Sequence, residues 1–198
     1  MGKFKSITLA GTLSLMAAAA WADGHAKSWT LDPALSNVSF GSIKNDYVGE
    51  SHSFGDISGG VTGNGQVEIS LGLGSVQTNI DIRNERMIEH VFKNAPDAKI
   101  TAEIDMSELD ALAIGEATTI ETFGTVALLG TDNELDAKLF VMRLSETQVM
   151  VASEGMVMLS TEDAGINAGI DVLQELAGLD SITRVSPVSL RLFFTSGS

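Results

Sequence analysis

Cysteine is absent from this chain of 198 residues, proline occurs only three times, and aromatic residues make up 6% of it. The lack of cysteine excludes disulfides, iron–sulfur clusters, covalent haem attachment and thiol nucleophiles. It also leaves no cysteine near the N-terminus to which a lipid could be attached. The fold must therefore rely on apolar burial and on the closure of a sheet.

Positive charge is scarce as well. Lysine and arginine number 12 against 26 aspartates and glutamates, so the formal net charge is −14. A surface of this sign repels nucleic acids and anionic membranes, and we expect no nucleic-acid partner. Solubility is the simplest consequence of the charge, and attraction of a basic partner is the alternative.

The longest apolar run is confined to the N-terminus. Lys3 and Lys5 precede an apolar stretch over residues 7–20, which ends in the A-x-A pattern Ala20-Trp21-Ala22. Such a stretch is shorter than the roughly 20 residues of a membrane-spanning helix and is typical of a secretory signal peptide. A buried N-terminal helix is the alternative. We expect residues 1–22 to be cleaved and residues 23–198 to form a single periplasmic domain without stable membrane insertion.

Most of the remaining sequence has the period of β-strands. Residues 66–73 alternate strictly, with Val67, Ile69, Leu71 and Leu73 in one phase, as expected for a strand with one buried face. Segments 100–104, 135–141, 148–159 and 188–194 behave similarly, and glycine-rich or Asn/Asp-rich turns separate them. This pattern predicts an all-β fold, an antiparallel barrel or sandwich.

Two segments instead have helical spacing. The first covers residues 84–92 and the second residues 168–177, where Ile170, Leu173 and Leu176 lie close to one stripe and Gly178 is a suitable C-terminal stop.

Patterns that would indicate catalysis are missing. His25, His52 and His90 are scattered and lack the spacing of a zinc site. There is no Gly-x-Ser-x-Gly elbow, and no glycine-rich phosphate loop precedes a helix. We therefore expect no enzyme activity, no catalytic residue and no cofactor. The one metal candidate is His25, since cleavage after Ala22 would create an Asp23-Gly24-His25 terminus able to bind Cu(II) or Ni(II), with chance placement as the alternative.

Five segments resemble, in the same order, motifs of the YceI-like family. They are residues 29–40, residues 54–61, Thr78 with Arg83-Asn84, Phe92 and Pro96, residues 124–130, and residues 163–166. The chain differs from the family at Leu35, Arg86 and Leu129, where histidine is usual, and at Asn84, where aspartate is usual.

The resemblance implies an exported, antiparallel, lipocalin-like β-barrel of about eight strands with one or two short helices. It also implies that the barrel binds a long-chain isoprenoid, quinone-like or fatty-acyl lipid, which it carries or sequesters. Alternation alone does not distinguish a lipid cavity from a filled core. The inward phase contains small residues and adaptable methionines, which suit a flexible apolar ligand but also ordinary packing.

The apolar phases and the resemblance together yield a predicted set of lipid-binding residues. Arg83 is included as a polar contact for the lipid, with a surface or strand-pairing role as the alternative. The full set is Phe40, Ile69, Leu71, Arg83, Phe92, Ile104, Val126, Leu139, Val151, Leu173 and Leu192.

Three further interpretations are open. A small outer-membrane barrel shares the export signal and the alternation, although it needs aromatic girdles at both interfaces. An isomerase-type enzyme acting on a bound lipid needs a titratable group inside the cavity. The segment from Ala164 to Gly178 is predicted to be a mobile helical lid over one barrel mouth, hinged at Gly165, Gly169 and Gly178, with a helix packed on the outside wall as the alternative.

Overall fold

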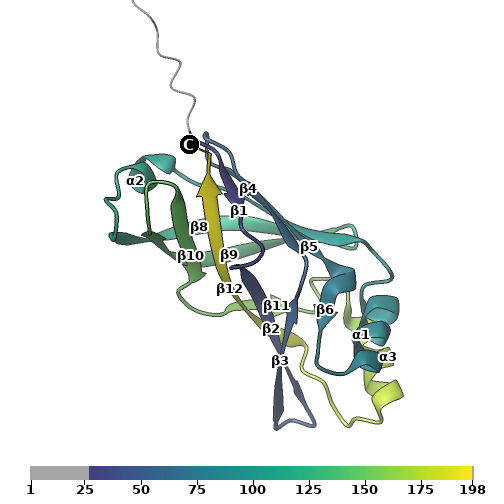
Figure 1. Ribbon diagram of the computed structural model, residues 1–198. Coiled ribbons are helices and arrows are strands. Elements are labelled where there is room, and N and C mark those ends of the chain that lie inside the picture. Colours follow the sequence, from purple (N-terminus) through teal and green to yellow (C-terminus); the bar gives the residue numbers. More distant parts are fainter. Residues whose placement is uncertain (1–26, 198) are drawn as a thin grey trace, which may run out of the picture.

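Eight strands close an antiparallel barrel in this computed structural model, which describes residues 27–197 (Figure 1). Every hydrogen-bonded pair of neighbours in the ring is antiparallel, and the last strand pairs with the first to close it. In ring order the strands are β1 (Trp29–Leu31), β4 (Ile57–Val61), β5 (Gln66–Gly72), β7 (Asp97–Glu103), β8 (Ala117–Leu128), β9 (Thr131–Arg143), β10 (Gln148–Ser153) and β12 (Val185–Ser196).

Four more strands extend one end of this ring. β2 (Asn37–Lys44) and β11 (Val157–Ser160) pair with opposite edges of β12, β3 (Val48–Phe54) pairs with β2, and β6 (Val76–Gln77) pairs with β3. β1 and β2 also share one edge of β12, separated by the turn at Asp32-Pro33. In that turn the Asp32 Oδ1 atom accepts a hydrogen bond from the Ala34 backbone N–H at 2.9 Å. The segment predicted as one long strand over residues 148–159 is therefore two strands, β10 and β11.

Three short α-helices accompany the barrel within residues 27–197, one more than the sequence predicted: α1 (Asp81–Arg86), α2 (Met106–Asp110) and α3 (Asn167–Ala177). A 3-10 turn, η1 (Leu73–Ser75), precedes β6, and a π-helical turn, η2 (Met87–Val91), continues α1. The predicted helices over residues 84–92 and 168–177 are both confirmed. α1 and α3 lie beside each other at the end of the barrel far from β1 and β4 (Figure 1). None of the helices in the described range is long and apolar enough to cross a membrane.

Inward-facing side chains form two apolar clusters at different depths of the barrel. The closed-end cluster is centred on Trp29, Leu31, Ile57, Ile69 and Phe194. The helical-end cluster contains residues of η1, η2 and α3, with Leu128 of β8. The outer face carries charged side chains as well as exposed apolar ones such as Phe123. Cross-strand ion pairs join Lys99 to Glu68 at 3.7 Å and Lys138 to Glu121 at 2.7 Å.

Candidate binding cavity

A cavity of about 480 Å³ lies inside the barrel, bounded by the two clusters. Strands β2, β3, β5, β7, β8, β9, β11 and β12 contribute to its wall, together with α1, η2 and α3. Small inward residues such as Ala98, Gly124 and Ala137 occupy positions where a large side chain would fill the interior. An eight-stranded barrel is just wide enough for side chains to fill or for one small ligand, so these small residues leave room for a ligand.

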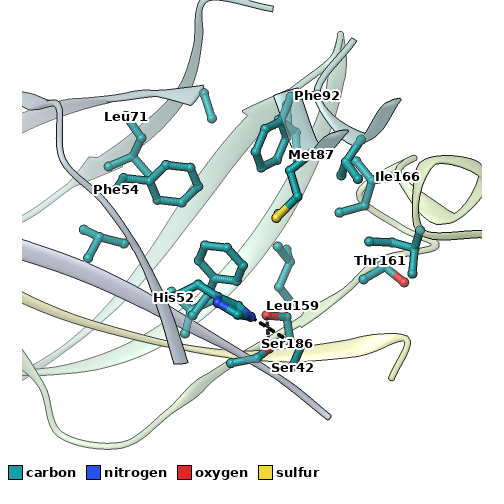
Figure 2. A pocket seen from close by; sticks show the side chains of 18 of the residues that line it. Ser42, His52, Phe54, Leu71, Met87, Phe92, Leu159, Thr161, Ile166 and Ser186 are labelled. Atoms are coloured by element: carbon teal, nitrogen blue, oxygen red, sulfur yellow. Dashed lines mark hydrogen bonds between the residues drawn. The ribbon is translucent and has the colours of Figure 1, made fainter. Parts of the chain in front are cut away.

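Aromatic rings line one side of the cavity. The centroid distances are 5.1 Å from Phe40 to His52, 5.3 Å from Phe40 to Phe54 and 6.0 Å from Phe54 to Phe92. Figure 2 shows the Phe54 and Phe92 rings with the Met87 thioether facing the same interior. This series connects β2 and β3 with the helical end and presents flat apolar surface to a ligand.

Helices α1 and α3, with η2 between them in space, cover the helical end of the cavity. Ile170, Leu173 and Ala177 of α3 line it, whereas Leu176 is 46% exposed. The predicted stripe included Leu176. A helix has 3.6 residues per turn, so Ala177, seven residues after Ile170, returns to the face of Ile170, whereas Leu176, six residues after it, does not. Ile80 and Ile82 also line the cavity, with exposed fractions of 43% and 51%, and so mark its opening to solvent.

A cluster of charged side chains lies beside this opening. The Glu50 carboxylate pairs through Oε2 with Arg83 Nη1 at 2.7 Å and through Oε1 with Lys44 Nζ at 3.2 Å. Partial burial raises the pKa of Glu50, but hydrogen bonds from Arg83 and Lys44 outweigh it and hold the pKa below 4.5. Glu50 is therefore an anion at neutral pH with both oxygens occupied.

Arg83 has a structural role as well as a place in the cavity wall. Its second terminal nitrogen donates to the Thr78 carbonyl oxygen, and Asn84 Oδ1 accepts from the Thr78 backbone N–H at 2.9 Å. Thr78 thus holds α1 to the segment that follows β6, and the Arg83–Glu50 pair holds α1 to β3. The third guanidinium nitrogen of Arg83, Nε, is buried and has no hydrogen-bond partner among the described residues.

His52 is the most buried titratable residue of the cavity wall, at 5% exposure. Its Nε2 atom lies 3.0 Å from the Ser42 hydroxyl (Figure 2), and its buried Nδ1 atom has no partner. Burial lowers the pKa of His52, and the nearby Arg83 and Lys44 charges lower it further against the opposing effect of Glu50. The imidazole is therefore neutral at pH 7.

Seven of the predicted lipid-binding residues lie in the cavity wall, and four lie elsewhere. The seven are Phe40, Leu71, Arg83, Phe92, Val126, Leu139 and Leu173. The other four, Ile69, Ile104, Val151 and Leu192, pack in the closed-end cluster. Those four point inward, as predicted. They lie at the level of the closed-end cluster, which bounds the cavity, and not at the level of the cavity itself. The metal candidate His25 lies outside the described residues.

The predicted set of lipid-binding residues omits most of the polar part of the wall, including Ser42, Lys44, Glu50 and His52. A signal for it was present. Ser42 and Lys44 continue the inward phase of Val38 and Phe40 on β2, and Glu50 and His52 share the phase of Phe54 on β3. Polar residues in the inward phase of a barrel strand indicate either a turn or a polar site.

Comparisons with known proteins give two structural matches of interest. A polyisoprenoid-binding domain from Saccharophagus degradans, implicated in plant cell wall breakdown, has 34% sequence identity and a TM-score of 0.83 over 85% of this chain and 98% of that chain. BcnA from Burkholderia cenocepacia has 14% identity and a TM-score of 0.60 over 82% and 98%, which shows a shared fold alone. No family model and no curated protein matches the sequence.

Proposed function

The chain belongs to the YceI-like family, and on that premise we propose that it binds a long-chain isoprenoid, quinone-like or fatty-acyl lipid inside the barrel. The observation that carries this proposal is the cavity of about 480 Å³ with a mainly apolar wall. Each buried CH₂ group contributes about 0.8 kcal/mol, so a long tail supplies well over about 10 kcal/mol before the entropic cost of binding. The structural match to a polyisoprenoid-binding domain supports this ligand class.

The proposed role is carriage or sequestration of the lipid without covalent chemistry. The alternative of a lipid-modifying enzyme required a titratable group in the cavity, and His52 meets that requirement. Acid–base catalysis also needs a proton acceptor or donor that is free to act on the ligand. His52 has no second such group beside it, because both oxygens of Glu50, the carboxylate on the same strand, are held by Lys44 and Arg83, and this favours binding. Incubation with candidate lipids and chromatography of the products tests this, since a product formed in proportion to protein would support the enzyme.

The test of binding is native mass spectrometry of the protein purified from a lipid-containing host. We expect an added mass that disappears on delipidation, and solvent extraction should identify the lipid. Titration of the delipidated protein with a prenyl alcohol should restore the complex at one lipid per chain. Identical masses before and after delipidation, with no binding on titration, would contradict the proposal.

The proposed location is the periplasm, reached through cleavage of residues 1–22. The charged pairs on the outer face of β5, β7, β8 and β9 support a barrel surrounded by water rather than by hydrocarbon. Expression of the complete chain in a bacterial host, followed by osmotic release, should yield a product that begins at Asp23. Recovery only from the outer membrane with detergent would instead support the membrane-barrel alternative.

A further inference from the structure

The barrel wall has a seam between β9 and β11, and within residues 27–197 no strand pairing joins the two across it. β10 pairs with residues 139–143 of β9, and the Glu154 N–H donates to the Lys138 carbonyl oxygen at 2.9 Å. Beyond this point β11 follows β12, and residues 131–137 of β9 pair with β8 alone. One edge of β9 is therefore open along residues 131–137.

The open edge of β9 presents backbone hydrogen-bonding groups together with carboxylates. Backbone groups alternate between the two edges of a strand, so those of Asp132, Glu134 and Asp136 point into the seam, as the Lys138 carbonyl does. The side chains of these three acidic residues are exposed on the outer face. Lys138, the one lysine of β9, pairs with Glu121 of β8 instead of with any of them. The edge is thus negative and has free backbone donors and acceptors.

The inner side of the same edge is apolar. Leu135 and Ala137, which alternate with the acidic residues along β9, line the cavity. Across the seam Val157 and Leu159 of β11 line it as well. Side chains directly opposite each other in an antiparallel pair lie on the same face of the sheet. A strand complementary to this edge therefore has lysine or arginine in its outward phase and apolar residues in its inward phase.

A second copy of this chain does not meet that requirement through the same edge. Two β9 edges paired antiparallel about Glu134 would place Asp132 of each copy opposite Asp136 of the other, and like charges directly opposite each other destabilise a sheet. The formal net charge of −14 opposes self-association further. Charged residues on an edge strand are a common protection against self-pairing. The edge is therefore closed to its own copy and complementary to a basic strand.

We propose that an extended segment of another protein, in which lysine or arginine alternates with apolar residues, pairs antiparallel with β9 at the seam. Its basic side chains lie outside, opposite Asp132, Glu134 and Asp136. Its apolar side chains face inward and pack beside Leu135 and Ala137. Main-chain hydrogen bonds supply the affinity of such strand addition, and the alternate side chains supply its specificity. This interaction is independent of the proposed lipid binding.

The test uses an eight-residue fluorescent peptide that alternates lysine with valine, titrated into the full-length mature protein and followed by anisotropy. One control peptide has glutamate in place of lysine, and another has the same residues with the four lysines in one block. Each control should bind at least about tenfold more weakly, because only the alternating basic peptide places a lysine opposite each carboxylate.

Backbone methylation tests the pairing itself. In the antiparallel arrangement the N–H groups of the lysines point to β9 and those of the valines point away from it. N-methylation at the lysines should therefore weaken binding at least about tenfold, whereas N-methylation at the valines should leave it within about threefold. The reverse pattern would overturn the antiparallel pairing.

Two variants locate the peptide on the protein. Glu134→Lys should weaken binding of the basic peptide at least about tenfold and strengthen binding of the glutamate peptide. Glu103→Lys is the matched control, since Glu103 is an exposed carboxylate on β7, a strand paired with both β5 and β8, and it should keep the wild-type preference. Amide exchange resolved by NMR should slow at Asp132, Glu134 and Asp136 when the basic peptide is present.

Three outcomes would overturn the proposal. Equal affinity for the alternating and block peptides would show attraction by net charge alone. Protection of amides in another strand, without protection in β9, would place the peptide elsewhere. A dimer of the free protein in analytical ultracentrifugation that Glu134→Lys abolishes would assign the edge to a second copy.

Discussion

At the scale of single residues, the effect of a substitution depends on two things. One is whether the side chain points into the barrel or out of it, and the other is how deep it lies along the barrel axis. Leu139 faces the cavity, Leu192 faces the closed-end cluster at 5% exposure, and Ser189 faces outward on β12. An unpaired carboxylate is costly wherever no water or counter-charge reaches it. The three positions should therefore respond differently to the same substitution.

We predict that Leu192→Asp lowers the free energy of unfolding by about 3 kcal/mol or more, because the closed end leaves no space for water. Leu139→Asp should retain the fold, since the cavity beside it can admit water, but should abolish lipid binding. Ser189→Asp is the matched control and should change neither property. Urea denaturation and lipid titration measure the two effects, and a folded, lipid-binding Leu192→Asp protein would show that the assigned depth is incorrect.

The buried His52 also makes stability depend on pH. Because folding lowers its pKa below 6.5, the unfolded chain binds the proton more readily than the folded protein. Stability is therefore greatest above about 6.5 and falls as the pH decreases toward the lowered pKa. The pKa of Glu50 is lowered too, so its contribution is lost at more acidic pH, below 4.5.

We predict that the melting temperature of the wild-type protein falls as the pH is reduced below about 6.5. The melting temperature of the His52→Leu variant should fall less over this interval. His90→Leu serves as the control for removal of a histidine from the chain. Thermal denaturation across this pH range measures the difference. The same pH dependence in His52→Leu and in the wild type would contradict the assignment.

At the scale of elements, α3 is fastened to η2 by close backbone contact. A Cβ atom added at Gly169 would lie 2.5 Å from the His90 carbonyl oxygen and 2.6 Å from Val91 Cα. Gly169 was proposed as a hinge on sequence grounds, but this approach makes it a packing residue. Gly165 and Gly178, at φ of 69° and 62°, retain the backbone freedom that a hinge requires.

We predict that Gly169→Ala lowers the free energy of unfolding by about 2 kcal/mol, although alanine favours a helix interior by about 1 kcal/mol over glycine. The cost arises because backbone atoms of η2 must move. Gly74→Ala is the control, because a Cβ atom there meets nothing within 4 Å. A neutral or stabilising Gly169→Ala would show that the helices are less closely packed than described.

The predicted lid from Ala164 to Gly178 corresponds to α3 and its two flanking turns. Ile170 and Leu173 line the cavity, so the helix covers the barrel interior and does not pack on its outer wall. Arg184 fastens the exposed side of α3 by donating to Asp171 Oδ1 at 2.6 Å and to the Asn167 carbonyl oxygen at 3.2 Å. Any movement of α3 away from the barrel would require these contacts to break.

We predict that lipid binding slows amide hydrogen exchange in α3 more than in β8 or β9, because the ligand adds apolar contacts to Ile170 and Leu173. Arg184→Ala should speed exchange in α3 of the lipid-free protein and leave the barrel strands unchanged. Exchange measured by mass spectrometry provides the readout. Equal exchange in α3 with and without lipid would contradict the idea of a mobile lid.

At the scale of the whole molecule, the cavity reduces the stability of the empty barrel. Side chains that border empty space lack the packing partners they would have in a filled core. A bound lipid supplies those contacts and binds the folded state alone. Folding and binding are therefore linked, and the lipid-loaded protein is the more stable form.

We predict that a lipid at a hundred times its dissociation constant stabilises the protein by about 2.7 kcal/mol. For a domain of this size, that corresponds to a rise of about 5–10 °C in the melting temperature. The Leu139→Asp variant should show no such rise, which separates specific binding from a general effect of the lipid on the solution. Scanning calorimetry of loaded and delipidated protein provides the comparison.

The fold follows largely from local sequence patterns. Alternation with a period of two identified the strands around Ile69, Leu139 and Leu190 and the faces that point inward, and the observed barrel confirms the predicted fold class. Gly178 was identified as the end of α3, and it has the left-handed conformation expected there. These features are predictable because neighbours in sequence determine them.

The depth of each inward side chain along the barrel axis and the polar contacts in the cavity wall were not predictable from local patterns. Whether Leu192 or Leu190 borders the cavity depends on the stagger of strands around the ring, and no single strand encodes that stagger. Likewise, Glu50 and Arg83 are 33 residues apart in sequence, and the pKa of His52 is lowered first by burial inside the barrel and then by the charges of Arg83 and Lys44. The sequence by itself determined strands with one apolar face each, because side-chain direction is a local property, and its resemblance to the YceI-like family indicated a lipocalin-like barrel rather than a sandwich. Only the tertiary structure decided which residues enclose the cavity and which polar atoms are left without partners there, because both depend on contacts between distant segments.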